Sequence, residues 1–400
     1  MALLLLLVLP SGFSAGTVIR SLLTGQVDEV SSPLIKWFKE EPLIDAHSVP
    51  TRPGGLVDEE DIKRFVRIYF PRSYPSVEDF DFIMLHSPVM SHLHQKHAKW
   101  MYDAIKEGAG ALSAPSCMSV LPEIHEPWIN SILSDAFPSD CARVLAAGGP
   151  MGKVNFRIIV NRNFPEPVLT PFIPLGIERF VGYKAYLIIP RDGVAILARQ
   201  TGSFDEIVPY MVSWDYDQGR AMTIGDSFGL QFWSAYAHGH TDNPYGLDIL
   251  MNLVLYVTRN EIPAEPLILH KMRLSFVEFR TRMSLLLSMI EFAESLGANE
   301  ERVQQSIGDL ESGYSEAKGL YLSCEFQESE QAIESVLADF GEVEREVLKL
   351  KDNALLWVYM VEWLVITGTF MICSFVIWSF MVKRRLYREV EVTSAERRAD

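Results

Sequence analysis

The feature that most constrains this 400-residue chain is a long apolar run near its C-terminus. From Ala354 to Val382 the run contains one charged residue, Glu362. About 20 apolar residues in a helix cross the hydrocarbon core of a bilayer, whereas a helix on a soluble core usually keeps a polar face. Aromatic residues, which favour the headgroup level, lie near both ends of the run: Trp357, Tyr359, Trp363 and Trp378. The sequence therefore predicts one transmembrane helix over residues 354–382.

A basic segment follows the apolar run directly. It contains Lys383, Arg384, Arg385 and Arg388. Positively charged flanks of membrane helices stay on the cytoplasmic side. We therefore expect a single-pass protein of the cell membrane, which has the lipid bilayer as a partner. Residues 383–400 form its cytoplasmic tail, and the N-terminal part is extracytoplasmic.

A shorter apolar run, Leu3–Leu9, opens the chain and is followed by small residues at Gly12, Ser14 and Ala15. The run is too short to cross a bilayer, and small residues suit cleavage by a signal peptidase. We predict that residues 1–15 are a signal peptide. The alternative is a buried first strand.

Glu362 is the one charge inside the predicted span. It lies about two helical turns from the outer end, and an unpaired carboxylate in lipid is costly. Glu362 is therefore either neutral or turned toward the headgroups, or it contacts a polar or basic group on a second membrane helix. The second interpretation predicts a membrane-protein partner that binds through the transmembrane helix and the segment before it.

The formal net charge of −16 limits the partners of the chain. Nucleic-acid binding needs a basic face that neutralises phosphates, so no nucleic-acid partner is expected. No cofactor is predicted either. The four cysteines, Cys117, Cys141, Cys324 and Cys373, form no CxxC pair. Whether Cys117 and Cys141 form a disulfide stays open, because sequence separation does not set the Cα distance that a disulfide requires.

Residues 16–262 alternate β-rich runs with helical stretches, which predicts an α/β domain with a mostly parallel sheet. Strands are expected at 17–23, 43–50, 81–86, 111–114, 156–160, 182–189, 194–199, 208–214 and 220–225. Helices are expected near 30–39, 96–107 and 247–258. Beyond Pro263 and Pro266 the strand pattern stops, so we place the domain boundary at residue 262.

The sequence predicts an all-α stalk over residues 263–353. Apolar residues recur every three or four positions, at Val303, Ile307, Leu310, Tyr314, Ala317, Tyr321 and Cys324. A helix over 274–296 precedes this stripe, and a third helix follows it. No Gly or Pro interrupts residues 342–367, so we expect the third helix to continue unbroken into the membrane.

Three stretches of the first domain share an order and a spacing with a known superfamily. Tyr74–Leu85 is similar to one of its strands, and Trp100–Gly110 is similar to its helix, glycine turn and entry to the nucleophile strand. Val212–Asp226 is similar to its late hairpin and a strand that ends in Asp. Together they resemble the class I glutamine amidotransferase-like superfamily, in particular its membrane-associated branch. The resemblance covers most of residues 16–262 and implies a flavodoxin-like or amidotransferase-like sheet.

An active member of this superfamily holds a nucleophilic Cys on a strained strand-to-helix turn and activates it with a His. The resemblance places Cys117 near the nucleophile. Ser116 beside it, and Asp226 at the end of the late strand, are then candidate ligand-binding residues. Relatives often carry a His shortly after this Asp, where the chain has Phe228, which accepts no proton. The resemblance therefore implies a domain that binds rather than catalyses.

Asp45 and His47 are candidates on other grounds. They are expected where the second strand ends, at the carboxyl edge of the sheet, which is where open α/β domains bind ligands. The alternative is a turn that these residue types commonly form at the end of a strand.

Four histidines lie close in sequence: His86, His92, His94 and His97. Imidazoles that meet in space bind zinc, but no nearby Cys or carboxylate completes a set of four ligands. We therefore predict solvated histidines and no metal site.

Three functions stay open. The favoured hypothesis is a membrane-anchored extracytoplasmic binding protein with a non-catalytic amidotransferase-like domain. The second is a surface amidohydrolase or amidotransferase that uses Cys117. The third is a structural stalk subunit of a membrane complex.

Overall fold

The computed structural model describes residues 18–27, 33–52, 58–114, 127–146, 155–182, 185–202, 204–226, 228, 232–233, 243–296 and 301–396. The chain divides into two units. The first runs to Phe276 and also includes Glu316–Gln331, and the second comprises Val277–Ser315 and the chain from Ala332 onward.

An eight-stranded mixed sheet forms the centre of the first unit in the described part of the chain. Its strands are β1 (Ile19–Gly25), β2 (Ile44–Pro50), β3 (Phe82–His86), β4 (Gly110–Ala114), β5 (Arg157–Val160), β6 (Ala195–Thr201), β7 (Val208–Tyr216) and β8 (Gly219–Ile224). They lie in the order β2-β1-β3-β4-β8-β7-β6-β5. The pairs from β2 to β8 are parallel, and the pairs from β8 to β5 are antiparallel.

The sheet is thus mixed, where a mostly parallel one was predicted. The reason lies in the short connections of its second half. Asp217, with φ of 54°, and Gln218 join β7 to β8, and a turn of two residues can join only antiparallel neighbours. The described residues do not identify the sheet as flavodoxin-like.

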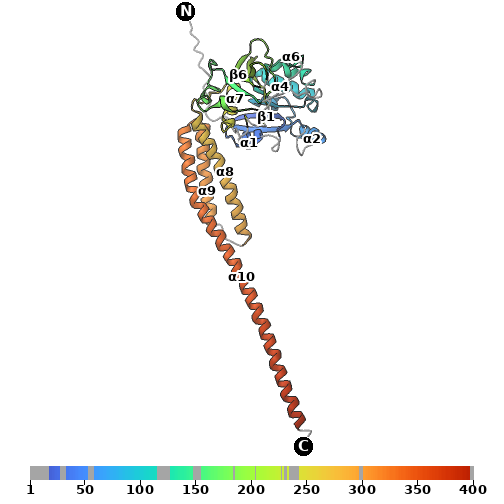
Figure 1. The fold of residues 1–400 in the computed structure, drawn as a ribbon, viewed down its shortest axis with the longest axis vertical. Helices are drawn as coiled ribbons and strands as arrows, with labels where there is room; N and C mark the ends of the chain where they lie inside the picture. Colours follow the sequence, from blue (N-terminus) through green and yellow to red (C-terminus); the bar gives the residue numbers. More distant parts are fainter. Residues whose placement is uncertain are drawn as a thin grey trace, which may run out of the picture. The chain divides into compact units, whose positions relative to one another are not determined.

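Helices cover both faces of this sheet. Helix α1 (Pro33–Glu40) and helix α7 (Gly246–Val257) pack with one set of buried strand side chains, and α2 (Glu59–Tyr69) and α4 (Gln95–Glu107) pack with the other set. Strand β3 shows the alternation: Phe82 and Met84 belong to the first core, and Ile83 and Leu85 to the second. Figure 1 shows α1 and α4 on opposite sides of β1. The α/β layering that the sequence predicted is confirmed.

Two elements differ from the prediction. The described residues of the expected strand over 182–189 form only isolated bridge positions, at Gly182, which pairs with Phe156, and at Tyr186. Further along this stretch, the Tyr186 N–H donates to the Gly225 carbonyl. Helix α2 was not predicted, although Asp58 caps it by accepting a hydrogen bond from the Asp61 N–H at 2.9 Å.

The remaining short elements are α3 (Pro75–Glu78), α6 (Cys141–Ala146) and 3-10 turns at Met90–His92, Ile132–Ala136, Thr170–Phe172 and Ile177–Arg179.

Three long helices complete the chain: α8 (Pro266–Ser295), α9 (Glu301–Leu322) and α10 (Phe326–Glu396). Within the second unit, the Phe279 ring of α8 stacks on Tyr314 of α9 with centroids 4.4 Å apart and meets Phe340 of α10 edge-on at 5.6 Å. Arg282 Nη2 of α8 lies 2.8 Å from Glu344 Oε2 of α10. Tyr314 belongs to the predicted apolar stripe, so α9 packs on α8 through that residue. Figure 1 shows α8 and α9 running side by side.

Helix α10 runs unbroken for 71 residues, as expected from the absence of Gly and Pro over 342–367. Within it, the apolar run has its side chains exposed, with Trp363 71% and Phe370 75% accessible. A core helix would bury such residues, whereas none of the most apolar window of α10 is buried. By length and composition α10 can cross a membrane, which indicates membrane anchoring.

Candidate functional site

The carboxyl ends of β1, β3 and β4 are joined closely by main-chain contacts. Gly25 closes β1 with φ of 109°, and a Cβ there would lie 1.9 Å from the His86 carbonyl oxygen. The Gln26 N–H donates to that same carbonyl at 2.7 Å. Ser87, with φ of 49°, donates its N–H to the Ala114 carbonyl at 2.7 Å. Close approach of the backbones therefore requires glycine at position 25.

His86 lies at this end of the sheet and is buried. Its Nδ1 donates to the Gln26 carbonyl at 2.8 Å, and its Nε2 accepts from the Phe228 N–H at 3.4 Å. Both ring nitrogens of His86 thus lie within hydrogen-bond distance of main-chain groups.

Aromatic side chains fill the space beyond β7 and β8. Phe228, Phe232 and Trp233 are fully buried, and the Phe228 and Trp233 ring centroids lie 4.7 Å apart. Tyr210 meets Phe232 edge-on at 6.1 Å. Burial, reinforced by the neighbouring charge of Asp226, raises the pKa of Tyr210 well above its usual range. This end of the described sheet is therefore a packed aromatic core around one buried carboxylate.

Of the site residues that the family resemblance implies, the structure describes Asp226 but not Cys117 or Ser116. Asp226 follows β8, two residues before Phe228, at the carboxyl end as expected. Cys117 and Ser116 lie outside the described residues. Cys141, at the start of α6, is disulfide-bonded, and its partner also lies outside them.

Asp45 and His47 are not at the end of their strand. They are the second and fourth residues of β2, the edge strand, which continues to Pro50. His47 Nε2 donates to the Tyr69 carbonyl at 2.7 Å. The strand continues to Pro50, the end predicted for it, with Val49 buried in the core, so neither residue lies at the carboxyl edge.

The four clustered histidines have separate structural roles. His92 Nδ1 donates to the Thr51 carbonyl at 2.9 Å, and His94 caps α4 by accepting from the Lys96 N–H at 3.2 Å. The His97 ring stacks on Phe70 with centroids 4.1 Å apart. No group of three or more His, Cys, Asp or Glu side chains within the described ranges is placed to hold a metal ion.

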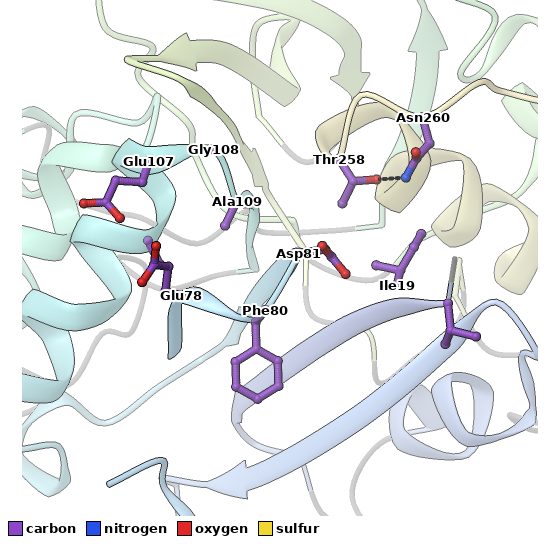
Figure 2. Close-up of a pocket in the computed structure, with 11 residues that line it drawn as sticks. Ile19, Glu78, Phe80, Asp81, Glu107, Gly108, Ala109, Thr258 and Asn260 are labelled. Atoms are coloured by element: carbon purple, nitrogen blue, oxygen red, sulfur yellow. Dashed lines mark hydrogen bonds between the residues drawn. The ribbon is translucent and has the colours of Figure 1, made fainter. Parts of the chain in front are cut away.

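A cavity of about 440 Å³ opens at the opposite end of the sheet, beside the amino ends of β1, β3 and β4. Figure 2 shows Glu78 and Glu107 on one side of it and Thr258 and Asn260 on the other. The Asn260 amide donates to Thr258 Oγ1 at 2.9 Å. This site was not predicted, because its residues come from four separate loops and helix ends.

The charged groups that line this cavity are all acidic: Glu78, Asp81 and Glu107. Asp81 Oδ2 accepts from the Arg20 N–H at 2.9 Å, and Glu107 accepts from the Tyr74 hydroxyl. Burial, followed by Glu107, raises the pKa of Tyr74, so the phenol keeps its proton. The cavity therefore favours a cation or an amine over an anion.

A buried ionic network lies elsewhere in the first unit. The Arg273 guanidinium, in the first part of α8, donates through Nε to Glu41 Oε2 and through Nη1 to Asp248 Oδ1, both at 2.6 Å. The Tyr321 hydroxyl donates to Glu41 Oε1 at 2.8 Å. His270 Nδ1 lies 2.7 Å from Asp248 Oδ2. The network thus connects the end of α1, helix α7, the start of α8 and the end of α9.

The carboxylates of this network stabilise the charged form of the buried Arg273 guanidinium. Burial alone would lower the pKa of Arg273, but Glu41, Tyr321 and Asp248 outweigh burial and raise that pKa well above its usual range. Arg273 Nη2 is buried and has no hydrogen-bond partner among the described residues. The sequence signal for this network is Arg273 itself, a charged residue that lies between Met272 and Phe276, which are both buried.

Comparisons with known proteins do not identify a family. No protein-family model and no characterised protein matches the chain. The solved structures of the cytoplasmic proteins STM3548 from Salmonella typhimurium and STM1381 from Salmonella typhimurium LT2 are 14% and 13% identical to it, with TM-scores of 0.43 and 0.42. The matches cover 59% and 60% of this chain and 98% and 97% of those proteins.

A β-galactosidase from Rahnella sp. R3 matches 62% of this chain with 32% of its own length, at 9% identity and a TM-score of 0.32. At these scores none of the three structures assigns a fold family or an activity to the chain.

His97 supplies a pH-dependent prediction. Burial lowers the pKa of His97 from 6.5 to about 4, with smaller contributions from Lys96 and His94. Between these two values the unfolded chain binds a proton that the folded chain does not, so stability falls as the pH falls from 6.5 to 4. We expect His97→Phe, which keeps the ring stack on Phe70 but cannot titrate, to lose less stability over this window. Urea denaturation at pH 7 and pH 4.5 measures the difference.

The matched control is His47→Gln, on the edge strand, which should retain the acid sensitivity of the parent chain. An equal loss of stability in the parent and in His97→Phe would show that His97 does not cause it.

Proposed function

We propose that this protein is a membrane-anchored extracytoplasmic binding protein. The observation that carries the proposal is α10, which starts at Phe326 in the first unit and continues without a break through the apolar run. Basic residues follow that run, as is typical of a cytoplasmic flank. The disulfide at Cys141 supports export, since disulfides persist mainly in oxidising compartments.

The α/β domain is, in this proposal, a non-catalytic relative of the class I glutamine amidotransferases. Main-chain groups engage both nitrogens of His86, and Phe228 is buried at the position where relatives often carry a His. Loss of a general base lowers a rate by roughly 10²–10⁴-fold. A domain with this chemistry is better suited to binding than to amide transfer.

Orientation can be tested with the free, exposed thiol of Cys324. In a Cys373→Ser background, a membrane-impermeant maleimide should label Cys324 in intact cells, because the first unit lies outside. The matched control is Cys324→Ser with Ser394→Cys, which places the thiol in the tail and should react only after permeabilisation. Labelling of the tail thiol in intact cells, with protection of Cys324, would reverse the proposed orientation.

The absence of catalysis can be tested at Cys117. Cys117→Ala should leave the hydrolysis of glutamine and of simple amides at the background rate of the parent protein, and should leave ligand binding unchanged. Hydrolysis by the parent that Cys117→Ala abolishes, together with loss of labelling by a thiol-reactive probe, would instead establish the amidohydrolase alternative.

Glu362 belongs to the proposal as the membrane contact. Its side chain is exposed on α10 and has no ion pair with another described residue. A carboxylate in this position favours a second membrane helix that offers a basic or hydrogen-bonding group.

A further inference from the structure

A second cavity in the first unit differs in chemistry from the one at the amino edge of the sheet. It has a volume of about 640 Å³ and lies between the segment that leads into α8 and the corner between α9 and α10. Apolar side chains form much of its lining, including Leu255, Ile268, Leu269 and Phe326. Its size is within the range of pockets that bind drug-sized ligands or short peptide segments. We call it the corner groove.

Four glutamates also line the corner groove. Glu261 and Glu265 come from the segment that leads into α8, Glu325 directly precedes α10, and Glu328 lies in the first turn of α10. All four are exposed, and none forms an ion pair or a side-chain hydrogen bond with another described residue. No Lys or Arg is part of the lining. The groove therefore combines an apolar surface with carboxylates on two sides.

Helix dipoles explain part of this pattern. Carboxylates are favourable near the N-terminus of a helix, and these four lie near the starts of α8 and α10. The dipoles do not explain why both sets converge on one apolar groove, since like charges that share a site repel one another. Burial, followed by the charge of Glu261, raises the pKa of the Cys324 thiol in the same groove, consistent with a negative potential there.

We propose that the corner groove binds a basic, apolar peptide segment of another protein, in which leucine-like side chains alternate with Lys or Arg. The leucine-like side chains pack against the apolar lining, and the Lys or Arg side chains form ion pairs with the glutamates on either side. This inference rests on the proposed function, because it names the partner class of the binding protein.

Cys324 makes the proposal testable by covalent capture. The full chain with Cys373→Ser, in nanodiscs of zwitterionic lipid, is treated with short peptides that carry a thionitrobenzoate disulfide. The Cys324 thiolate attacks this disulfide, the peptide becomes attached, and thionitrobenzoate leaves and is measured. The probes are an alternating Lys/Leu octapeptide, the same peptide with Glu in place of Lys, and the same peptide with Ser in place of Leu.

We expect the Lys/Leu peptide to react more than tenfold faster than either of the other two, with the advantage shrinking as salt is raised. Replacement of Glu261, Glu265, Glu325 and Glu328 by Gln together should reduce the advantage to less than threefold. The matched control replaces Glu60, Glu206, Glu311 and Glu316 by Gln, which changes the net charge equally at exposed positions away from the groove and should keep the advantage.

Three results would overturn the proposal. Equal rates for the Lys/Leu and Glu/Leu peptides would show that the glutamates do not select charge. Equal rates for the Lys/Leu and Lys/Ser peptides would show a site for cations alone. An equal loss in the control variant would assign the effect to net charge. The orientation of the chain, tested separately with the impermeant maleimide, does not depend on any of these outcomes.

Discussion

The interaction on which the rest of the first unit depends is the burial of Arg273. A charged guanidinium inside a protein is costly unless its donors are paired, and here Glu41 and Asp248 each accept from it at 2.6 Å. Tyr321 adds a hydrogen bond to Glu41. Removal of the guanidinium would leave two buried carboxylates without their cation. The segments that carry these side chains must therefore meet in one arrangement.

This arrangement also sets the walls of the corner groove. The Leu43 N–H donates to Glu41 Oε1 at 3.1 Å, and Leu43 is part of the groove lining. The Tyr321 ring lies edge-on to Phe326, another lining residue, at 5.7 Å. The groove and the ionic network thus share main-chain and ring contacts. A binding surface built on such a network is preorganised, which reduces the cost of ordering it when a partner binds.

The sequence predicted those parts of the fold that depend on local patterns. Strand β3 and helix α4 lie within one residue of their expected bounds, because a buried run and an amphipathic helix that ends at Gly108 leave clear periodicities. Helix α2 was missed because only two of its residues, Ile62 and Val66, are buried. Two buried positions make a short apolar stripe, and the first turn is acidic. The Arg273 network was missed for another reason: Glu41 is 232 residues away in sequence, and no local pattern reports such a pairing.

The most direct test of this account compares two arginines of α8. Arg273 is 4% exposed in its ionic network, whereas Arg282 is 25% exposed in its bridge to Glu344. Breaking a buried pair costs about 3–5 kcal/mol, and an exposed pair contributes up to about 1 kcal/mol. Urea denaturation of the full chain in nanodiscs should therefore show a loss of about 3–5 kcal/mol for Arg273→Ala and no more than about 1 kcal/mol for Arg282→Ala. Equal losses would contradict the central role of Arg273.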